Sequence, residues 1–142
     1  LIEHMQKHIG DAGSVVSWHA DFENTQNKNM ALMYPEKQKF LQGLIDRTMD
    51  LEDPFKEGYV DIQFQGSTSI KKVLPALIPA LDYSGMKVAS GTDAMEAWHR
   101  LVGLPDGPAK DELKASMLEY CKLDTLAMVR IFNFLEELND RS

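Results

Sequence analysis

Apolar residues near the end of the chain recur at intervals of three and four, which is the spacing of one helix face. This stripe consists of Met117, Cys121, Met128, Ile131, Leu135 and Leu138. A carboxylate, Asp124, interrupts the stripe, and Tyr120 lies one turn before it. The spacing predicts a helix over residues 110–139, with both polar side chains on its buried face and about 5–6 Å apart at Cβ.

Shorter patterns predict the elements that come earlier. The β-branched and aromatic run at 14–19 predicts a buried strand, and a polar helix opens after it at Asp21. Residues 59–64 fit either a short strand or an extended arm. Short helices are predicted within 66–77, where Pro75 disrupts or ends the helix, and over 93–101. An amphipathic helix is predicted over 35–51, beginning at Pro35, with Phe40, Leu41, Leu44, Ile45 and Met49 facing inward.

One strong strand among about five helices predicts an α/β fold that is rich in helix. Parallel sheets bury both faces and seldom consist of one or two strands, so part of the sheet is expected to be missing. No repeat, low-complexity tract or long linker divides the 142 residues. We therefore predict a single domain over residues 1–142.

Composition narrows the classes of protein that remain. The chain is 44% hydrophobic and 26% charged, with a net charge of −7, which argues against a protein that coats DNA nonspecifically. There is no run of about 18 apolar residues and no secretory signal pattern, so no contact with a membrane is expected. A single cysteine excludes an internal disulfide framework. A cytoplasmic protein is the plain interpretation, and because the chain begins Leu-Ile-Glu we expect a piece of something longer.

Asp124 admits two interpretations. A buried carboxylate is costly unless it is paired or binds a metal. It could hydrogen bond to the backbone of a loop or pair with an arginine across the core. It could instead be one of several carboxylates that hold a catalytic metal ion, which requires a second acid from elsewhere in the chain.

The segment HADFEN (19–24) offers that second acid. Here a predicted strand ends and a helix begins, which is the edge where open α/β sheets bind ligands. Glu23 lies at this edge, beside Phe22, which we expect to point into the core. Alternatively, Asp21 or Glu23 is a first-turn acid that interacts with the helix dipole.

These pieces together resemble a known superfamily. A strand, an acid after Phe at a helix start, and a late helix with Tyr-x-x-x-Asp follow the order of the second and third motifs of DEDD-type 3′–5′ exonucleases, which have a ribonuclease H-like fold. More closely, the chain from about residue 9 to residue 138 resembles an uncharacterised bacterial family of predicted nucleases in that superfamily. Four segments carry this resemblance, namely GSVVSWHADFEN, the Met-Asp-Leu at 49–51, GSTSIKKVLPAL and LEYCKLDTLAMV.

The resemblance implies roles for individual residues. Asp124 matches the third-motif metal ligand, and Tyr120 matches the tyrosine that helps orient the attacking water in the tyrosine-type subclass. Glu23 stands where the second-motif acid is expected, although the exonucleases at large have Asp there. His19 stands where Asn is usual and is assigned to substrate binding. The implied cofactor is Mg²⁺ or Mn²⁺, and the implied partner is DNA or RNA.

The first motif of the superfamily, Asp-x-Glu on the first strand, has no counterpart before residue 14. Asp50-Leu51-Glu52 has this spelling, but it follows a predicted helix, so we do not assign it to the first motif. The chain is therefore expected to be the C-terminal part of the exonuclease-like domain, with the first strands missing. Two metal ions need more carboxylates than Glu23 and Asp124 supply, so this chain alone is expected to be a poor nuclease or none.

The segment GSTSIKKVLPAL also has chemistry of its own. A helix start at Ser69 followed by Lys71 and Lys72 could bind a phosphate of the substrate on free backbone N–H groups. The alternative is an ordinary N-cap and two solvated lysines. His4 and His8 are expected on a solvated helix face, because no metal-binding pattern accompanies them. Core positions are expected for Trp18, Trp98 and Cys121.

Two functional hypotheses follow. The first is a metal-dependent nuclease that hydrolyses phosphodiester bonds in DNA or RNA. The second is a non-catalytic module that derives from the same fold and binds nucleic acid or protein. An incomplete sheet would also expose an edge strand, which favours a homodimer through that edge.

Overall fold

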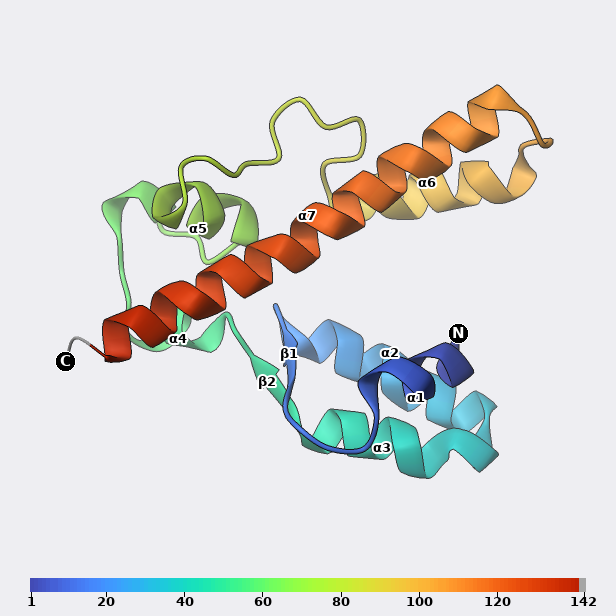
Figure 1. Cartoon of the computed structure of the whole chain (residues 1–142), viewed down its shortest axis with the longest axis horizontal. Coiled ribbons are helices and arrows are strands. Elements are labelled where there is room, and N and C mark those ends of the chain that lie inside the picture. Colours follow the sequence, from blue (N-terminus) through green and yellow to red (C-terminus); the bar gives the residue numbers. More distant parts are fainter. Residues whose placement is uncertain (141–142) are drawn as a thin grey trace. The chain divides into compact units, whose positions relative to one another are not determined.

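The computed structural model describes residues 1–140, and its contacts divide the chain into two compact units, Leu1–Val60 and Asp61–Ser142. Figure 1 shows the elements of each unit. The prediction of one domain over residues 1–142 stays a prediction, because compact units of contact do not by themselves define domains.

The first unit contains a small parallel sheet. Strands β1 (Val15–Ser17) and β2 (Thr48–Asp50) pair with Val16 opposite Met49, and two helices connect them. Parallel strands require such a crossover because they cannot be joined by a hairpin. The remaining elements of the unit are α1 (Ile2–Ile9), α2 (Ala20–Met33), a 3-10 turn (Pro35–Lys37), α3 (Gln38–Asp46) and α4 (Asp53–Glu57).

The predicted helix over 35–51 is too long at both ends. Residues 35–37 form the 3-10 turn, and α3 ends at Asp46, after which the chain joins the sheet. The backbone N–H of Val15 donates to the carbonyl of Arg47 (3.0 Å), so pairing with β1 replaces the next helical turn. Met49 is 55% exposed, and its predicted inward orientation is therefore wrong.

Apolar side chains of α1 and α3 form the core of the first unit. Leu41 and Leu44, both predicted to face inward, are almost fully buried. Trp18 is half-buried against Phe55, with ring centroids 5.6 Å apart. The core cluster consists of Ile2, Phe40, Leu41 and Leu44, with Met5, Val15, Met30 and Ala31 packed against it.

Arg47 fastens the loop between α1 and β1. Its guanidinium donates to the backbone carbonyls of Ala12 (2.7 Å), Gly13 (2.6 Å) and Gly10 (2.5 Å). Gly10 and Gly13 have φ of 67° and 82°, in the left-handed region that glycine adopts without steric cost. One side chain therefore holds the turn that brings β1 alongside β2.

Replacing Arg47 with methionine should lower the free energy of unfolding by about 1–2 kcal/mol, because three carbonyls lose a charged donor while the aliphatic stem remains. Urea unfolding followed by circular dichroism measures the change. Lys39→Met is the matched control, since it removes one positive charge from the preceding helix, at a position where the side chain is exposed. Equal losses of stability in the two variants would contradict the role of Arg47 in holding this loop.

Helices make up the second unit. The long C-terminal helix, α7 (Pro108–Asn139), packs against α5 (Ile70–Leu77) and α6 (Gly91–Gly103). In Figure 1, α6 lies along the first half of α7 and α5 along the second. Residues 62–64 form a 3-10 turn, so a strand at 59–64 is not observed. The most buried side chains of this unit are Val73 and Leu74 of α5 and Ala127 and Ile131 of α7.

The apolar stripe on α7 is only partly buried. Ile131 is fully buried, as predicted, and the methionines and leucines of the stripe are half-buried. Cys121 is exposed, and Trp98 on α6 is 57% exposed, so both predicted core positions are wrong. Helical spacing identifies a face, but the length of the neighbouring helices decides how much of that face is covered.

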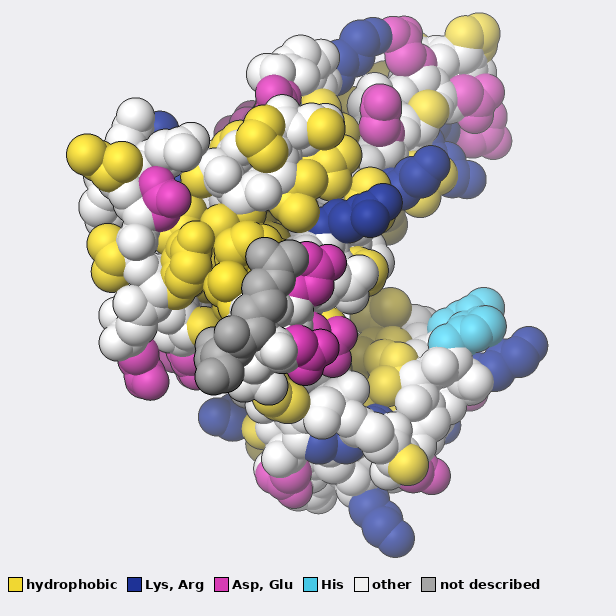
Figure 2. Space-filling view, turned by 60° about the vertical axis from the view of Figure 1, so that its left-hand side comes forward, with side chains coloured by type: hydrophobic (Ala, Val, Ile, Leu, Met, Phe, Trp, Pro, Cys, Tyr) yellow, Lys and Arg dark blue, Asp and Glu magenta, His cyan; other side chains and the backbone are white. Residues whose placement is uncertain are grey.

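Large hydrophobic side chains also remain on the surface of both units (Figure 2). On α6, Met95, Trp98 and Val102 are all more than half exposed and follow helical spacing. Within residues 1–140, no helix combines the length and the apolarity that crossing a membrane requires. The assignment to a ribonuclease H-like α/β fold stays a prediction.

Candidate functional site

The carboxyl end of the small sheet carries a charged cluster formed by His19, Asp50, Glu52 and Lys56. β1 ends at Ser17, and α2 begins after His19, whose backbone is left-handed (φ 62°, ψ 58°). Both oxygens of Asp50, the last residue of β2, accept hydrogen bonds from the start of α2. The backbone N–H of His19 donates to Oδ1 (2.9 Å) and that of Ala20 to Oδ2 (3.1 Å). Asp50 therefore caps this helix from the neighbouring strand.

A second carboxylate of the cluster, Glu52, is buried and contacts two positive groups. Its Oε2 lies 2.9 Å from Nδ1 of His19 and 2.9 Å from Nζ of Lys56. The hydrogen bond and charge of Glu52 raise the pKa of His19 above its usual value, against the opposing effect of burial. Glu52 likewise raises the pKa of Lys56, so that this side chain stays charged.

The pKa of Asp50 is lowered overall. Burial alone raises it, but the backbone N–H groups of Glu52, Ala20 and His19 and the Lys56 ammonium outweigh that effect. The sequence pattern Asp-x-Glu was visible at 50–52, but its position at the end of a strand was not, because the residues before it resemble a helix. Asp50 and Glu52 are thus site residues that the sequence analysis did not assign.

Glu23, assigned to the second motif, lies in the first turns of α2 with its side chain exposed. Within residues 1–140 its carboxylate makes no hydrogen bond or ion pair and is therefore accessible. Phe22 is 57% exposed, so the prediction that it points into the core is wrong. The two residues face solvent because the opposite side of α2 packs on α3 and β2.

Asp124 and Tyr120 lie together on α7, as the helical spacing predicts, and a loop tyrosine joins them. The hydroxyl of Tyr83 donates to Oδ1 of Asp124 at 2.7 Å, and the rings of Tyr83 and Tyr120 lie 6.1 Å apart. Burial, and then hydrogen bonding to the Asp124 carboxylate, raise the pKa of both tyrosine hydroxyls. Asp124 therefore accepts a hydrogen bond from the neutral Tyr83 hydroxyl, and this bond provides a partner for its half-buried carboxylate.

Tyr83 could not be found from the sequence, because it lies in the irregular segment between α5 and α6, where no periodicity marks an inward position. Tyr83 is nevertheless buried, with only 7% of its surface exposed. Of the two interpretations of Asp124, this contact resembles the first, in which the carboxylate bonds to a loop, but the partner is a side chain and not the backbone.

The start of α5 presents the predicted phosphate-binding residues. Ser69 is the N-cap residue, but its side chain makes no capping hydrogen bond. Lys72 donates to Oε1 of Gln65 (2.7 Å), and both lysines are exposed. Lys71 lies close enough to Asp93 of α6 to help lower the pKa of that carboxyl, after the hydrogen bonds from Ser90 and Ala89.

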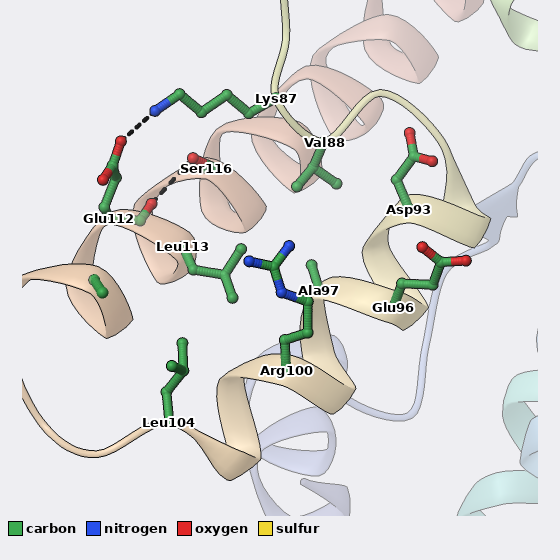
Figure 3. Close-up of a pocket in the computed structure, with 11 residues that line it drawn as sticks. Lys87, Val88, Asp93, Glu96, Ala97, Arg100, Leu104, Glu112, Leu113 and Ser116 are labelled. Carbon is green, nitrogen blue, oxygen red and sulfur yellow. Dashed lines mark hydrogen bonds and ion pairs between the residues drawn. The ribbon is translucent and has the colours of Figure 1, made fainter.

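A cavity of about 460 Å³ opens in the second unit between α6, α7 and the segment before α6 (Figure 3). Apolar and charged side chains both line it, and the guanidinium of Arg100 projects toward Leu113. An ion pair between Lys87 and Glu112 spans one side. None of the residues assigned from the sequence lines this cavity.

The predicted metal ligands belong to different units, Glu23 to the first and Asp124 to the second. Among the described residues, no group of three or more His, Cys, Asp or Glu side chains is arranged to hold a metal ion. The donors present therefore do not amount to a complete Mg²⁺ or Mn²⁺ site. His4 and His8 stack on one another in α1, with ring centroids 6.1 Å apart.

Comparison with known proteins gives one similarity. Residues 1–69 match a family described as Domain of unknown function (DUF2779). The matched segment includes the whole first unit, and with it the cluster of His19, Asp50, Glu52 and Lys56, but it ends before Tyr120 and Asp124. No curated protein and no solved structure matches the chain.

Proposed function

We propose that the chain belongs to a metal-dependent nuclease of the ribonuclease H-like, 3′–5′ exonuclease kind, which hydrolyses phosphodiester bonds in DNA or RNA. The observation that carries this proposal is the Tyr120–Asp124 pair. Both side chains lie on one face of α7, and hydrogen bonding to the carboxylate raises the pKa of the Tyr120 hydroxyl, after the larger effect of burial. A tyrosine one turn before a carboxylate is what the third motif of these enzymes requires.

Five of the assigned residues have defined parts in the proposal. Asp124 and Glu23 are each proposed as a metal ligand, one in each unit, and Mg²⁺ or Mn²⁺ would supply Lewis-acid chemistry at the scissile phosphate when bound. Tyr120 orients the reacting water through its hydroxyl. Lys71 and Lys72, exposed at the start of α5, contact phosphates of the bound strand. Because the chain has a single cysteine, a cytoplasmic location goes with this function.

The test is Mn²⁺-dependent cleavage of 5′-labelled single-stranded DNA and RNA by the natural protein that contains this chain. Asp124→Asn should lower the initial rate about tenfold or more, because it removes the charge of a proposed ligand. Asp111→Asn, which neutralises an exposed acid in the first turn of the same helix, should cleave at the normal rate. Equal rates for the two variants would remove the basis of the proposal.

Tyr83→Phe separates a structural effect of Asp124 from a chemical one. This variant removes the 2.7 Å hydrogen bond to Oδ1 but keeps the carboxylate and its charge. If the role of Asp124 is chemical, Tyr83→Phe retains substantial activity while Asp124→Asn does not. Similar losses in both variants would assign Asp124 to holding the segment before α6.

A second function has its own support, namely a non-catalytic module that binds nucleic acid or protein. The exposed Met95, Trp98 and Val102 of α6 favour this alternative, since exposed apolar side chains at helical spacing are typical of docking faces. Binding of the labelled oligonucleotide without cleavage in Mn²⁺ would favour it over the nuclease. The two strands pair only with each other within residues 1–140, so an open sheet edge also supports a homodimer, which sedimentation equilibrium would detect.

A further inference from the structure

His19 is held in an unusual backbone conformation at the carboxyl end of the sheet. Left-handed φ and ψ are uncommon for a residue other than glycine and persist where surrounding contacts enforce them. The enforcing contact is Asp50, which accepts the N–H of His19 (2.9 Å) and that of Ala20 (3.1 Å). The position of the imidazole beyond the end of β1 is therefore fixed by the backbone and not by chance side-chain packing.

The two nitrogens of the His19 ring are in opposite environments. Nδ1 lies 2.9 Å from Oε2 of Glu52, whose side chain is only 8% exposed, while the side chain of His19 is 63% exposed. Within the described residues, no group hydrogen bonds to Nε2. A buried carboxylate on one nitrogen places the proton of the neutral ring on Nδ1 and leaves the lone pair of Nε2 directed at solvent.

Glu52 is itself held in place, so the orientation of the ring does not depend on one flexible contact. Its N–H donates to Oδ1 of Asp50 (3.0 Å), and its carboxylate pairs with Lys56 at 2.9 Å. Lys56 also contacts Asp50 and Asp53, both at 3.3 Å. The cluster is a connected network that includes the end of β2 and the first turn of α4.

The charges around His19 favour a proton-transfer role over direct anion binding. Asp50 of β2 and Glu52, the residue before α4, favour the imidazolium, and Lys56 of α4 opposes it. Asp21 and Glu23 add negative charge on α2 itself. The acids outnumber the single lysine, so a phosphate held by His19 alone would be repelled. The same surroundings stabilise the positive charge that the ring acquires when it accepts a proton.

We propose that His19 and Glu52 form an acid–base pair at the carboxyl edge of the sheet, with Glu52 as the positioning residue and Nε2 of His19 as the proton acceptor. The reaction of this pair with a phosphodiester, described next, rests on the proposed nuclease function. Nε2 takes a proton from a water molecule as the oxygen of that water bonds to phosphorus. The P–O bond to the 3′ oxygen of the shortened strand breaks, that oxygen takes a proton from solvent, and His19 releases its proton to solvent.

The basic lone pair on Nε2 can be measured without any nuclease activity, using p-nitrophenyl acetate and the 142-residue chain. Nε2 attacks the acyl carbon, p-nitrophenolate leaves, and water hydrolyses the acetylimidazole to acetate. The rate should rise with pH and show a midpoint above the ordinary histidine value of about 6.5, because the proton must leave Nε2 first. Absorbance of p-nitrophenolate gives the rate at each pH.

His19→Asn is the principal variant, because asparagine tolerates a left-handed backbone but cannot act as a base. It should lower the rate of ester cleavage by more than His99→Asn does, the control that removes an exposed histidine from α6. Glu52→Gln should move the midpoint of the pH profile back toward the ordinary value. If the buried amide of Glu52→Gln prevents folding, Glu52→Asp replaces it in this measurement, because aspartate keeps the charge but shortens the side chain.

Equal rates for His19→Asn and His99→Asn would overturn the proposal, and an unchanged pH midpoint in both Glu52 variants would overturn the positioning role. The oligonucleotide assay on the natural protein supplies the second arm. There, His19→Asn should lower kcat about 10²-fold with little change in KM. Full cleavage by this variant would overturn the phosphodiester step. A His19-dependent ester reaction in a protein that cleaves no oligonucleotide would refute the nuclease and leave the acid–base pair standing.

Discussion

Replacing Asp50 with alanine is expected to lower the free energy of unfolding by about 3 kcal/mol. The carboxylate accepts three backbone N–H groups, from His19, Ala20 and Glu52, at 2.9–3.1 Å. It also pairs with Lys56. Alanine leaves these donors without their acceptor at the point where α2 and α4 both begin, so two helix starts lose a partner together. Urea unfolding followed by circular dichroism measures the loss.

Lowering the pH should reduce the difference in stability between the normal chain and Asp50→Ala. Because the pKa of Asp50 is lower in the folded chain than in the unfolded one, its carboxylate stabilises the fold above the unfolded pKa of about 3.9. That contribution disappears as the pH falls through the lower, folded value. The stability gap between the normal chain and Asp50→Ala should therefore stay constant from about pH 7 to pH 5 and narrow as the pH falls below about 4. Asp46→Ala, an exposed acid at the end of α3, is the control, and a gap of the same size for both variants would contradict the capping role.

Replacing Ile131 with alanine should lower the free energy of unfolding by about 3–4 kcal/mol. The side chain is fully buried on α7, beside the fully buried Ala127, and the α5 residues Val73 and Leu74 are buried to the same degree. Removing three carbons at such a site leaves a cavity that a small helical unit can fill only by shifting α5 against α7. The cavity in Ile131→Ala should appear as a lower temperature of thermal unfolding.

Val129→Ala is the matched control for Ile131→Ala. It truncates another β-branched side chain two residues away on the same helix, but Val129 is 50% exposed. We expect it to change stability by no more than about 0.5 kcal/mol. If the two variants unfold alike, α7 does not pack as described, and the burial of its second half would need another explanation.

Local periodicity was sufficient for the longest element and insufficient for the short ones. Helix α7 runs for 32 residues, so its apolar repeat is sampled many times and its existence and the pairing of Tyr120 with Asp124 follow from spacing alone. Strand β2 has three residues, and Met49 continues the apolar pattern of the preceding helix. Only pairing with β1, more than thirty residues earlier, shows that helix α3 ends before it.

The same limit applies to the candidate sites. His19 and Glu23 could be singled out because they follow a strand, and Asp124 because it interrupts a stripe. The partners of His19 and Asp124 could not be found in this way. Glu52 contacts His19 across 33 residues of sequence, and Tyr83 contacts Asp124 across 41. A single sequence gives the type of a chemical group at a position, whereas the hydrogen bond that sets its ionisation is a property of the folded chain.

The cap that Asp50 forms on α2 has a consequence for ligands. A helix that opens at the carboxyl edge of a parallel sheet offers its positive pole to phosphate in many nucleotide-binding proteins. In this chain the pole is already neutralised by an internal carboxylate that bonds to the first free N–H groups. A mononucleotide approaching along the axis of α2 would meet a negative charge in place of open donors. The start of α2 is therefore not an open phosphate-binding site, because Asp50 already occupies its N–H groups.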